Sequence, residues 1–224
     1  MKKICLLSLA LLLLIGAAAG YCYTSERTPE YAINQLGAGI AAHDYDRVAR
    51  YADLDNIIIT AYDESTSLMA QRIEHLHELY PDDWFFRHDT AFMTKYIADR
   101  RTADIDLAGR SIEMYLKPDL TPVTRVDGQA HWLANEAEKF TQNYTASLQS
   151  VDKQGSDAST ATAIIAIKGN DSDYGRLVPE LTLRLTLTEQ PDGHWRVTRI
   201  ANGDEMFYPV LKGIEDYWTL QGWQ

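Results

Sequence analysis

The chain has no cysteine after its apolar N-terminal stretch. Its two cysteines, Cys5 and Cys22, both lie in the apolar N-terminal stretch, so residues 23–224 contain none. Disulfide bonds, thiolate catalysis and cysteine-ligated metals are therefore excluded for this part of the chain. A body of about 200 residues buries close to 70% of the surface of its unfolded chain, so it does not need a covalent cross-link to be stable.

Basic residues are scarce relative to acidic ones. Without Lys2 and Lys3, the remaining 19 basic residues face 32 acidic residues, which gives a net charge of −13. An acidic body without basic runs argues against nucleic acid and anionic lipid as partners. We interpret the excess negative charge as a contribution to solubility.

Motifs that carry catalytic or metal chemistry are also missing. The sequence has no GxSxG nucleophile elbow and no GxGxxG or Walker phosphate loop. The most metal-like string is EHLHE at residues 74–78, but His75 and His77 are two positions apart and point in roughly opposite directions on a helix. Pairing Glu74 with Glu78 supplies only two ligands, fewer than zinc requires. We therefore predict no catalytic residue, no metal and no cofactor, and interpret the string as a solvated helix face.

A long uncharged run is present at the N-terminus. Residues 4–23 follow Lys2 and Lys3 and contain no charged side chain. The run is long enough to span a bilayer as a helix, which takes about 20 residues, and it has the basic start, leucine-rich centre and small residues of a secretory signal. Either interpretation places the body outside the cytoplasmic membrane. Tyr21 and Tyr23 favour a retained anchor, with the membrane as partner through residues 4–23, whereas cleavage would give a secreted or periplasmic protein.

Residues 28–144 have the pattern of a helical half. Thr28 followed by Pro29 predicts a helix start, because a hydroxyl is favoured at the N-cap and proline at the first helical position. Asp82-Asp83 predicts the cap of an aromatic-rich helix, and the polar residues 100–109 predict a break. Apolar side chains recur at helical spacing in segments 31–40, 45–52, 57–79, 84–97, 112–116 and 129–144.

Residues 177–202 carry the strongest strand pattern. Leucines alternate with polar residues over positions 181–187, which is the period of a strand with one face in a core. Pro191-Asp192-Gly193 predicts a tight turn. Residues 194–200 predict the returning strand, and a change of phase in their apolar residues predicts a β-bulge near Thr198-Arg199.

Two more strands and a last helix complete the predicted fold. Residues 147–151 and 160–168 predict a strand pair around a turn at 154–157, and Asp204 predicts the cap of the final helix. The fold class predicted is α+β: an N-terminal helical half, then a four-stranded antiparallel curved sheet and a C-terminal helix. The predicted organisation is a signal peptide or anchor at 1–23 and one domain at 24–224, with helices at 28–144, the sheet at 146–202 and the closing helix at 204–220.

Two segments resemble known families. The opening PEYAINQLGAGIAAHDYDRVARYADLDNII, residues 29–58, resembles a family of exported bacterial proteins classed only as a domain of unknown function. The segment DGHWRVTRIANGDEMF, residues 192–207, is similar to the closing strand of nuclear transport factor 2-like, cystatin-like domains. The resemblance implies export and a cone-shaped α+β domain. It implies no activity, because that fold hosts enzymes, binding pockets and interaction modules alike.

The candidate site residues come from an acidic helix break and from the aromatic residues. His43-Asp44 could act as an acid–base pair, but Asp44 is favourably placed to cap the second helix, and we prefer that interpretation. Trp84, Tyr96 and Trp195 could line an apolar pocket between helices and sheet, or could be core. The pocket candidates are therefore Trp84, Tyr96, Trp195 and Asp44.

Three function classes fit these features. The leading hypothesis is a non-enzymatic extracytoplasmic module that binds an unknown protein or a small apolar ligand. The alternatives are a small-molecule isomerase or hydrolase with an acid–base site in the cone of the sheet, and a structural cell-envelope subunit. An enzyme predicts ionisable side chains that converge in one apolar cavity, whereas a binding module predicts an apolar cavity without them, and a structural subunit predicts an exposed apolar patch.

Overall fold

The computed structural model describes residues 26–153, 159–178 and 180–222. The predicted signal peptide or membrane anchor at residues 1–23 and the predicted turn at 154–157 lie outside these residues. Within the described ranges, every helix is too short or too polar to cross a membrane.

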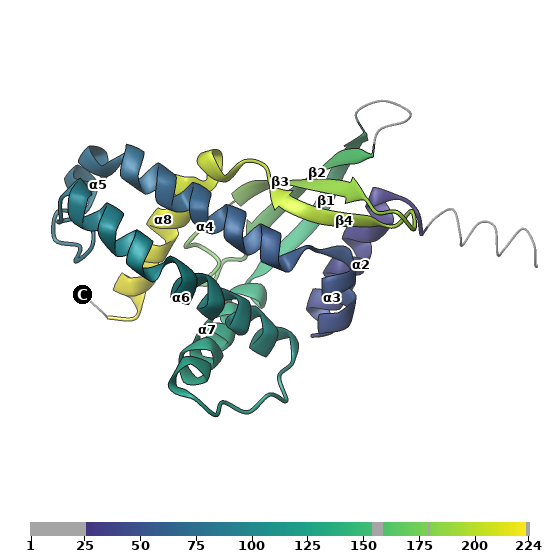
Figure 1. Ribbon diagram of the computed structural model, residues 1–224, viewed down its shortest axis with the longest axis horizontal. Helices are drawn as coiled ribbons and strands as arrows, with labels where there is room; N and C mark the ends of the chain where they lie inside the picture. Colours follow the sequence, from purple (N-terminus) through teal and green to yellow (C-terminus); the bar gives the residue numbers. More distant parts are fainter. Residues whose placement is uncertain (1–25, 154–158, 179, 223–224) are drawn as a thin grey trace, which may run out of the picture.

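The predicted fold class is confirmed: a helical half precedes a four-stranded curved sheet, and a helix ends the chain (Figure 1). The sheet order is β1-β2-β3-β4, and each neighbouring pair is antiparallel. The elements, labelled as in Figure 1, are α2 (Pro29–Ala41), α3 (Tyr45–Tyr51), α4 (Leu54–Gln71), α5 (Ile73–Leu79), α6 (Thr90–Leu116), α7 (Arg125–Thr141), β1 (Tyr144–Lys153), β2 (Thr160–Gly169), β3 (Glu180–Glu189), β4 (Trp195–Ile200) and α8 (Gly203–Leu220).

The hairpin of β3 and β4 forms as its sequence predicts. The Gly193 N–H donates to the Gln190 carbonyl at 2.8 Å, and the φ of Gly193 is +84°, a conformation that favours glycine. Leu187 pairs with Val197 and Thr186 pairs with Arg199, so Thr198 is left without an opposite residue. The predicted bulge is confirmed at Thr198.

Several helix boundaries differ from the sequence prediction. The segment 57–79 forms two helices, since α4 ends at Gln71 and α5 begins at Ile73, with Arg72 between them. Helix α4 also begins earlier than predicted, at Leu54, with Asp53 as its cap. The final helix has Asn202 at its N-cap, and the predicted cap Asp204 lies in its first turn. The predictions for Thr28 and Asp44 are confirmed: their side chains accept from the Tyr31 and Arg47 N–H groups at 3.1 and 3.0 Å.

The predicted cap at Asp82-Asp83 and the predicted break at 100–109 are wrong. Asp83 accepts from the Phe85 and Phe86 N–H groups at 2.8 Å in a local turn, and the helix begins only at Thr90, where Asp89 caps it. Helix α6 then runs unbroken for 27 residues. Its polar middle forms charge pairs along the helix and to α4: Arg100 contacts Asp104 at 2.7 Å, and Arg101 contacts Asp63 at 2.7 Å.

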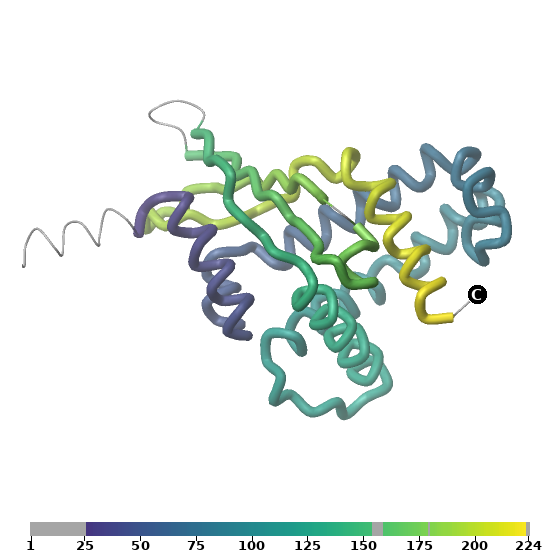
Figure 2. Tube along the Cα trace, turned by 180° about the vertical axis from the view of Figure 1, so that it is seen from behind, coloured from purple at the N-terminus to yellow at the C-terminus, as the bar shows by residue number. Residues whose placement is uncertain are grey.

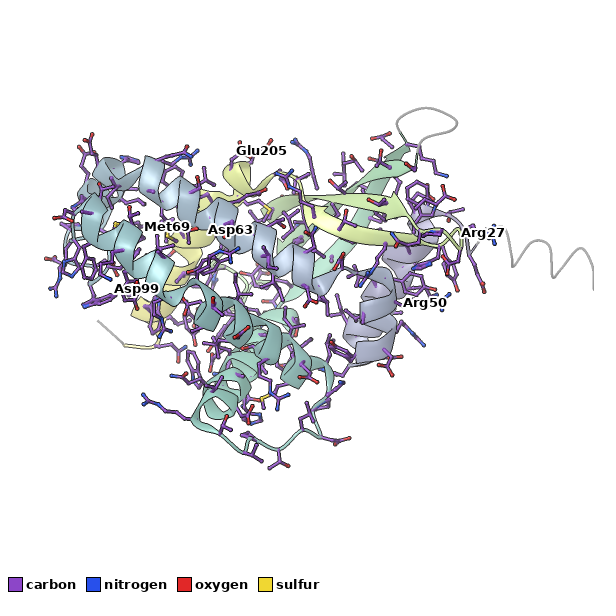
Figure 3. The ribbon with its side chains drawn as sticks, viewed as in Figure 1. Arg27, Arg50, Asp63, Met69, Asp99 and Glu205 are labelled. Carbon is purple, nitrogen blue, oxygen red and sulfur yellow. The ribbon has the colours of Figure 1, made fainter. Side chains whose placement is uncertain are left out.

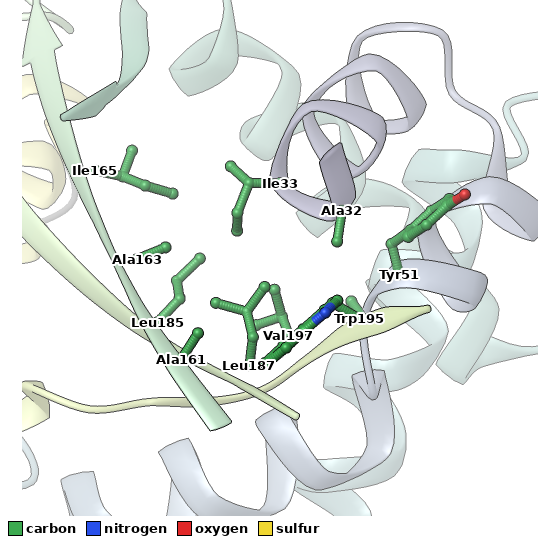
Figure 4. Close-up of a cluster of buried hydrophobic side chains, with 11 residues drawn as sticks. Ala32, Ile33, Tyr51, Ala161, Ala163, Ile165, Leu185, Leu187, Trp195 and Val197 are labelled. Atoms are coloured by element: carbon green, nitrogen blue, oxygen red, sulfur yellow. The ribbon is translucent and has the colours of Figure 1, made fainter. Parts of the chain in front are cut away.

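The main core lies on the face of the sheet covered by α2 and α3 (Figure 4). Ala32, Ile33 and Tyr51 come from these helices and pack against the buried strand residues Ala161, Ala163, Ile165, Leu185, Leu187, Trp195 and Val197. Two further clusters stabilise the helices. One joins α5 and α6 to α8, through residues such as Leu76, Met93 and Phe207, and the other joins α6 to α7 through Met114 and Ala130.

The start of α7 is four residues earlier than predicted, and a buried aspartate explains it. Thr124 and Asp127 form a capping box, in which the Asp127 N–H donates to Thr124 Oγ1 at 3.1 Å and Asp127 Oδ2 accepts from the Thr124 N–H at 3.0 Å. Arg110 of α6 reaches Asp127 Oδ1 at 2.8 Å. This network closes the turn between α6 and α7.

The Arg110 guanidinium holds the pKa of Asp127 at about 2, helped by backbone N–H donors. A carboxylate whose pKa is lower in the folded state stabilises the fold above its ordinary pKa and loses this effect as the pH falls to the folded pKa. We therefore expect Asp127→Asn to lower the melting temperature at neutral pH, and the difference from wild type to shrink between about pH 4 and pH 2. Thermal melts across this range check the prediction. Asp119→Asn, on the exposed neighbouring loop, is the control, and a difference independent of pH would contradict the argument.

Candidate apolar binding site

The leucine ladder of β3 changes its surroundings along the strand. Leu185 and Leu187 are buried in the main core, whereas Leu181 and Leu183 are only half-buried on the same face. All four point to the side of the sheet that carries the helices, since they occupy alternate positions. The core therefore fills this face at the Trp195 end and leaves the other end less completely packed.

A cavity of about 570 Å³ lies where the packing is less complete. The sheet contributes eight apolar side chains to its wall: Ala146, Leu148, Ile165, Ile167, Leu183, Leu185, Val197 and Ile200. Cross-strand pairing brings them together, because Leu148 pairs with Ile165, and Ile165 with Leu183. Its volume lies in the usual range for small-molecule sites, about 300–1,000 Å³.

Helices α2 and α6 supply most of the opposite walls, with Val48 of α3 and Leu54 and Ile57 of α4. Ile33, Leu36, Gly37 and Ile40 line the cavity, and their spacing of three and four residues places them on one face of α2. From the end of α6 come Ile112, Tyr115 and Leu116. Ile40 is 37% exposed, and nothing lies within 4 Å of the position that a Cβ on Gly37 would take. This part of α2 therefore borders the open side of the cavity.

The lining is almost entirely hydrocarbon. Among the described residues that border the cavity, the polar side chains are those of Asn34 and Tyr115, and no aspartate, glutamate, histidine, lysine or arginine takes part. A general acid–base pair needs ionisable groups within hydrogen-bond reach of the substrate. The chemistry that this arrangement supports is the removal of apolar surface from water.

His43 fixes the α6 wall to the end of α2. Its φ is 51°, a left-handed residue that terminates the helix as a glycine often does. Its Nδ1 lies 2.7 Å from the Tyr115 carbonyl oxygen and its Nε2 lies 3.7 Å from Glu138 Oε2. Because a carbonyl oxygen can only accept, Nδ1 carries the proton in this contact. The imidazole thus positions Tyr115, and it does not pair with Asp44, which is occupied at the cap of α3.

The predicted pocket residue Trp195 lies in the core. It is 2% exposed, and its Nε1 donates to the Arg27 carbonyl at 3.1 Å. Arg27 and Arg50 mark the same end of the molecule in Figure 3. Trp195 is thus at the filled end of the sheet face, away from the open end of the leucine ladder.

Trp84 and Tyr96 lie together, but elsewhere. Their ring centroids are 5.4 Å apart in a cluster with Phe85 and Phe92 around the start of α6. Trp84 is 51% exposed. The four predicted pocket residues, Trp84, Tyr96, Trp195 and Asp44, therefore occupy three separate places, and in the described part of the chain none of them borders the cavity.

Several residues that border the cavity, such as Ile33, Leu36 and Leu183, lie on apolar faces that the sequence predicts, but nothing in the sequence indicates that the space between these faces is hollow. The signal in the sequence was the presence of small residues on apolar faces, such as Gly37 and Ala146, where a packed core would place larger side chains. Periodicity alone reports which face turns inward.

In the described ranges, no group of three or more histidine, cysteine or acidic side chains is placed to hold a metal ion. The Glu74–Glu78 string lies on α5, where His75 Nδ1 is 3.5 Å from Glu78 Oε2 and both side chains are exposed.

Comparisons with known proteins supply no relative: no family model matches the chain, and neither the curated proteins nor the solved structures contain a match. The two resemblances drawn from residues 29–58 and 192–207 gain no support from these comparisons. The cavity and its lining therefore carry the functional argument alone.

Proposed function

We propose that this protein is a non-enzymatic binding module that takes a small apolar ligand into the cavity between the sheet and helices α2 and α6. The observation that carries the proposal is a hollow of about 570 Å³ whose lining is hydrocarbon apart from Asn34 and Tyr115. Apolar pockets of this size, with few polar groups, are typical of small-molecule sites. Export of the body, retained on an anchor or released, remains part of the proposal, on the basis of residues 1–23.

The isomerase or hydrolase alternative is less well supported. It requires ionisable side chains that converge in the cavity, and the described lining has none besides the Tyr115 phenol. His43, the base of the predicted acid–base pair, is absent from the described lining, and its Nδ1 donates to the Tyr115 carbonyl. The structural-subunit alternative would place its interaction on exposed apolar residues such as Trp84 and Leu79.

Binding of the fluorescent probe N-phenyl-1-naphthylamine tests the proposal. We expect wild type to bind the probe with enhanced fluorescence, and Gly37→Phe to weaken binding at least tenfold, because the phenyl ring enters the space beside Leu36 and Ile40. The cavity loses volume without the removal of any existing side chain.

Gly128→Phe is the matched control. Gly128 is also an exposed helical glycine, on α7, and nothing lies within 4 Å of its Cβ position. Both variants replace a helical glycine by the same better helix former, a gain of a few tenths of a kcal/mol, so a difference in probe binding reports the cavity. Equal binding by the two variants, or no binding by wild type, would overturn the proposed function.

A further inference from the structure

Two further apolar cavities adjoin the first on the same side of the sheet. One, of about 380 Å³, lies between α7, α8 and the start of β3, and the other, of about 280 Å³, lies between α4 and α8. Figure 2 shows α8, at the yellow end of the chain, following β4 beside the end of the sheet. Residues of α8 line both of these cavities. Their positions raise the question of whether the three are separate.

The three cavities share walls. Ile167 of β2 borders both the first and the second cavity, whereas Val210 and Ile214 of α8 border both the second and the third. Ile200 of β4 borders the third and the first. A residue that lines two cavities separates them by no more than its own side chain. The three cavities therefore adjoin one another, and the first and second together reach from the α2 wall to the α8 wall.

Positive charge is absent from the described lining of all three cavities. The first two are bordered by no charged side chain, and the third is bordered by Glu64, which is paired with Arg199. A free carboxylate or phosphate in this hollow would meet no lysine, arginine or histidine to offset its desolvation. The overall negative charge of the protein opposes an anionic ligand as well.

We propose that the ligand is an uncharged single-chain lipid, of the long-chain alcohol or ester type, whose chain extends from the first cavity past Ile167 into the second. The inference rests on the proposed function and adds the shape and charge of the ligand. An elongated hydrocarbon hollow selects a flexible chain over a compact ring system, and the lack of cations selects an uncharged head over a fatty acid.

A series of 1-alkanols from hexanol to tetradecanol, in competition with N-phenyl-1-naphthylamine, measures the shape of the ligand. We expect affinity to rise about fourfold for each methylene, since burial of one CH₂ contributes about 0.8 kcal/mol. In Ile167→Phe the rise should stop at a shorter chain than in wild type, because the larger side chain narrows the passage between the first and the second cavity. Ile164→Phe is the control, because Ile164 lies on the other face of the same strand and faces away from the hollow.

Tetradecanoate at neutral pH measures the charge preference, and we expect it to bind at least tenfold more weakly than tetradecanol. A wild-type affinity that levels off at short alkanols would overturn the elongated site while the proposed function stands. Equal binding of carboxylate and alcohol would overturn the charge preference. Failure of wild type to bind both the probe and every alkanol would overturn the proposed function itself.

Discussion

Trp195→Ala is expected to lower the free energy of unfolding by roughly 3–5 kcal/mol, the range for removal of a buried large aromatic side chain. Trp195 is 2% exposed and packs among Leu187, Val197, Tyr51 and Ala32 (Figure 4). Its removal also leaves the Arg27 carbonyl without the indole N–H that contacts it at 3.1 Å. Both losses act where β4 meets the N-terminal helices.

Urea denaturation followed by far-ultraviolet circular dichroism measures this effect. Trp195→Phe should lower the free energy of unfolding by less than Trp195→Ala, because the phenyl ring keeps part of the packing. Both variants lose the hydrogen bond to the Arg27 carbonyl. Trp132→Ala is the control, since Trp132 is 40% exposed on α7 and its removal should cost far less. Trp195→Phe should retain the probe affinity of wild type, because Trp195 lies outside the described lining of the cavity. A loss of probe binding in a folded Trp195→Phe variant would contradict our placement of the site.

Asn202→Asp is expected to cost about 3 kcal/mol at neutral pH, because it buries an unpaired charge in place of a satisfied amide. Asn202 is 2% exposed. Its Oδ1 accepts from the Arg184 N–H at 2.9 Å, and its Nδ2 donates to the Thr182 carbonyl at 2.7 Å. The side chain thus continues the pairing of β3 beyond the end of β4. Aspartate would place a second oxygen against the Thr182 carbonyl.

The cost should shrink as the pH falls. Burial and the facing carbonyl would raise the pKa of the new carboxyl above its ordinary value, so the folded state would bind the proton more tightly than the unfolded chain. Stability of the variant relative to wild type should therefore recover as the pH falls to about 4, where a protonated carboxyl can donate to Thr182. Denaturation at several pH values tests this. Asn34→Asp, on an exposed position of α2, should stay within about 0.5 kcal/mol of wild type, and an Asn202→Asp cost that does not change with pH would contradict the argument.

The sheet could be predicted from the sequence because its signals are local. Alternating leucines at 181–187, the turn at 191–193 and the phase change at Thr198 each correspond to a feature of one hairpin. The choice between two possible helix caps could not be predicted from local signals. Asp83 and Asp89 both precede aromatic residues, and the choice of Asp89 as the cap depends on the packing of Phe86 and Met93 in the core formed with α8.

The middle of α6 shows why a polar composition is weak evidence for a break in a helix. Residues 100–109 carry charge, yet Arg100 and Arg101 use it in pairs with Asp104 and Asp63 that stabilise the helix and its contact with α4. The cavity could not be predicted for a different reason. An apolar stripe specifies that a face turns inward, whereas the volume left between two such faces depends on the distance between elements, which no local pattern encodes.

The contacts around Trp195 also have a consequence for the order in which the molecule can be completed. Trp195 reaches Arg27 across 168 positions of sequence, Arg196 reaches the Ala49 carbonyl across 147, and His194 reaches the Arg50 carbonyl across 144. The first helices thus have one of the last segments to be synthesised as their partner. Contacts so distant along the chain slow folding, because the entropy of closing a long loop opposes them. A ribosome that releases the chain from its N-terminus must therefore finish β4 before the contacts of α2 and α3 with that strand can form, and truncation ahead of β4 removes Trp195 and Val197 from the main core.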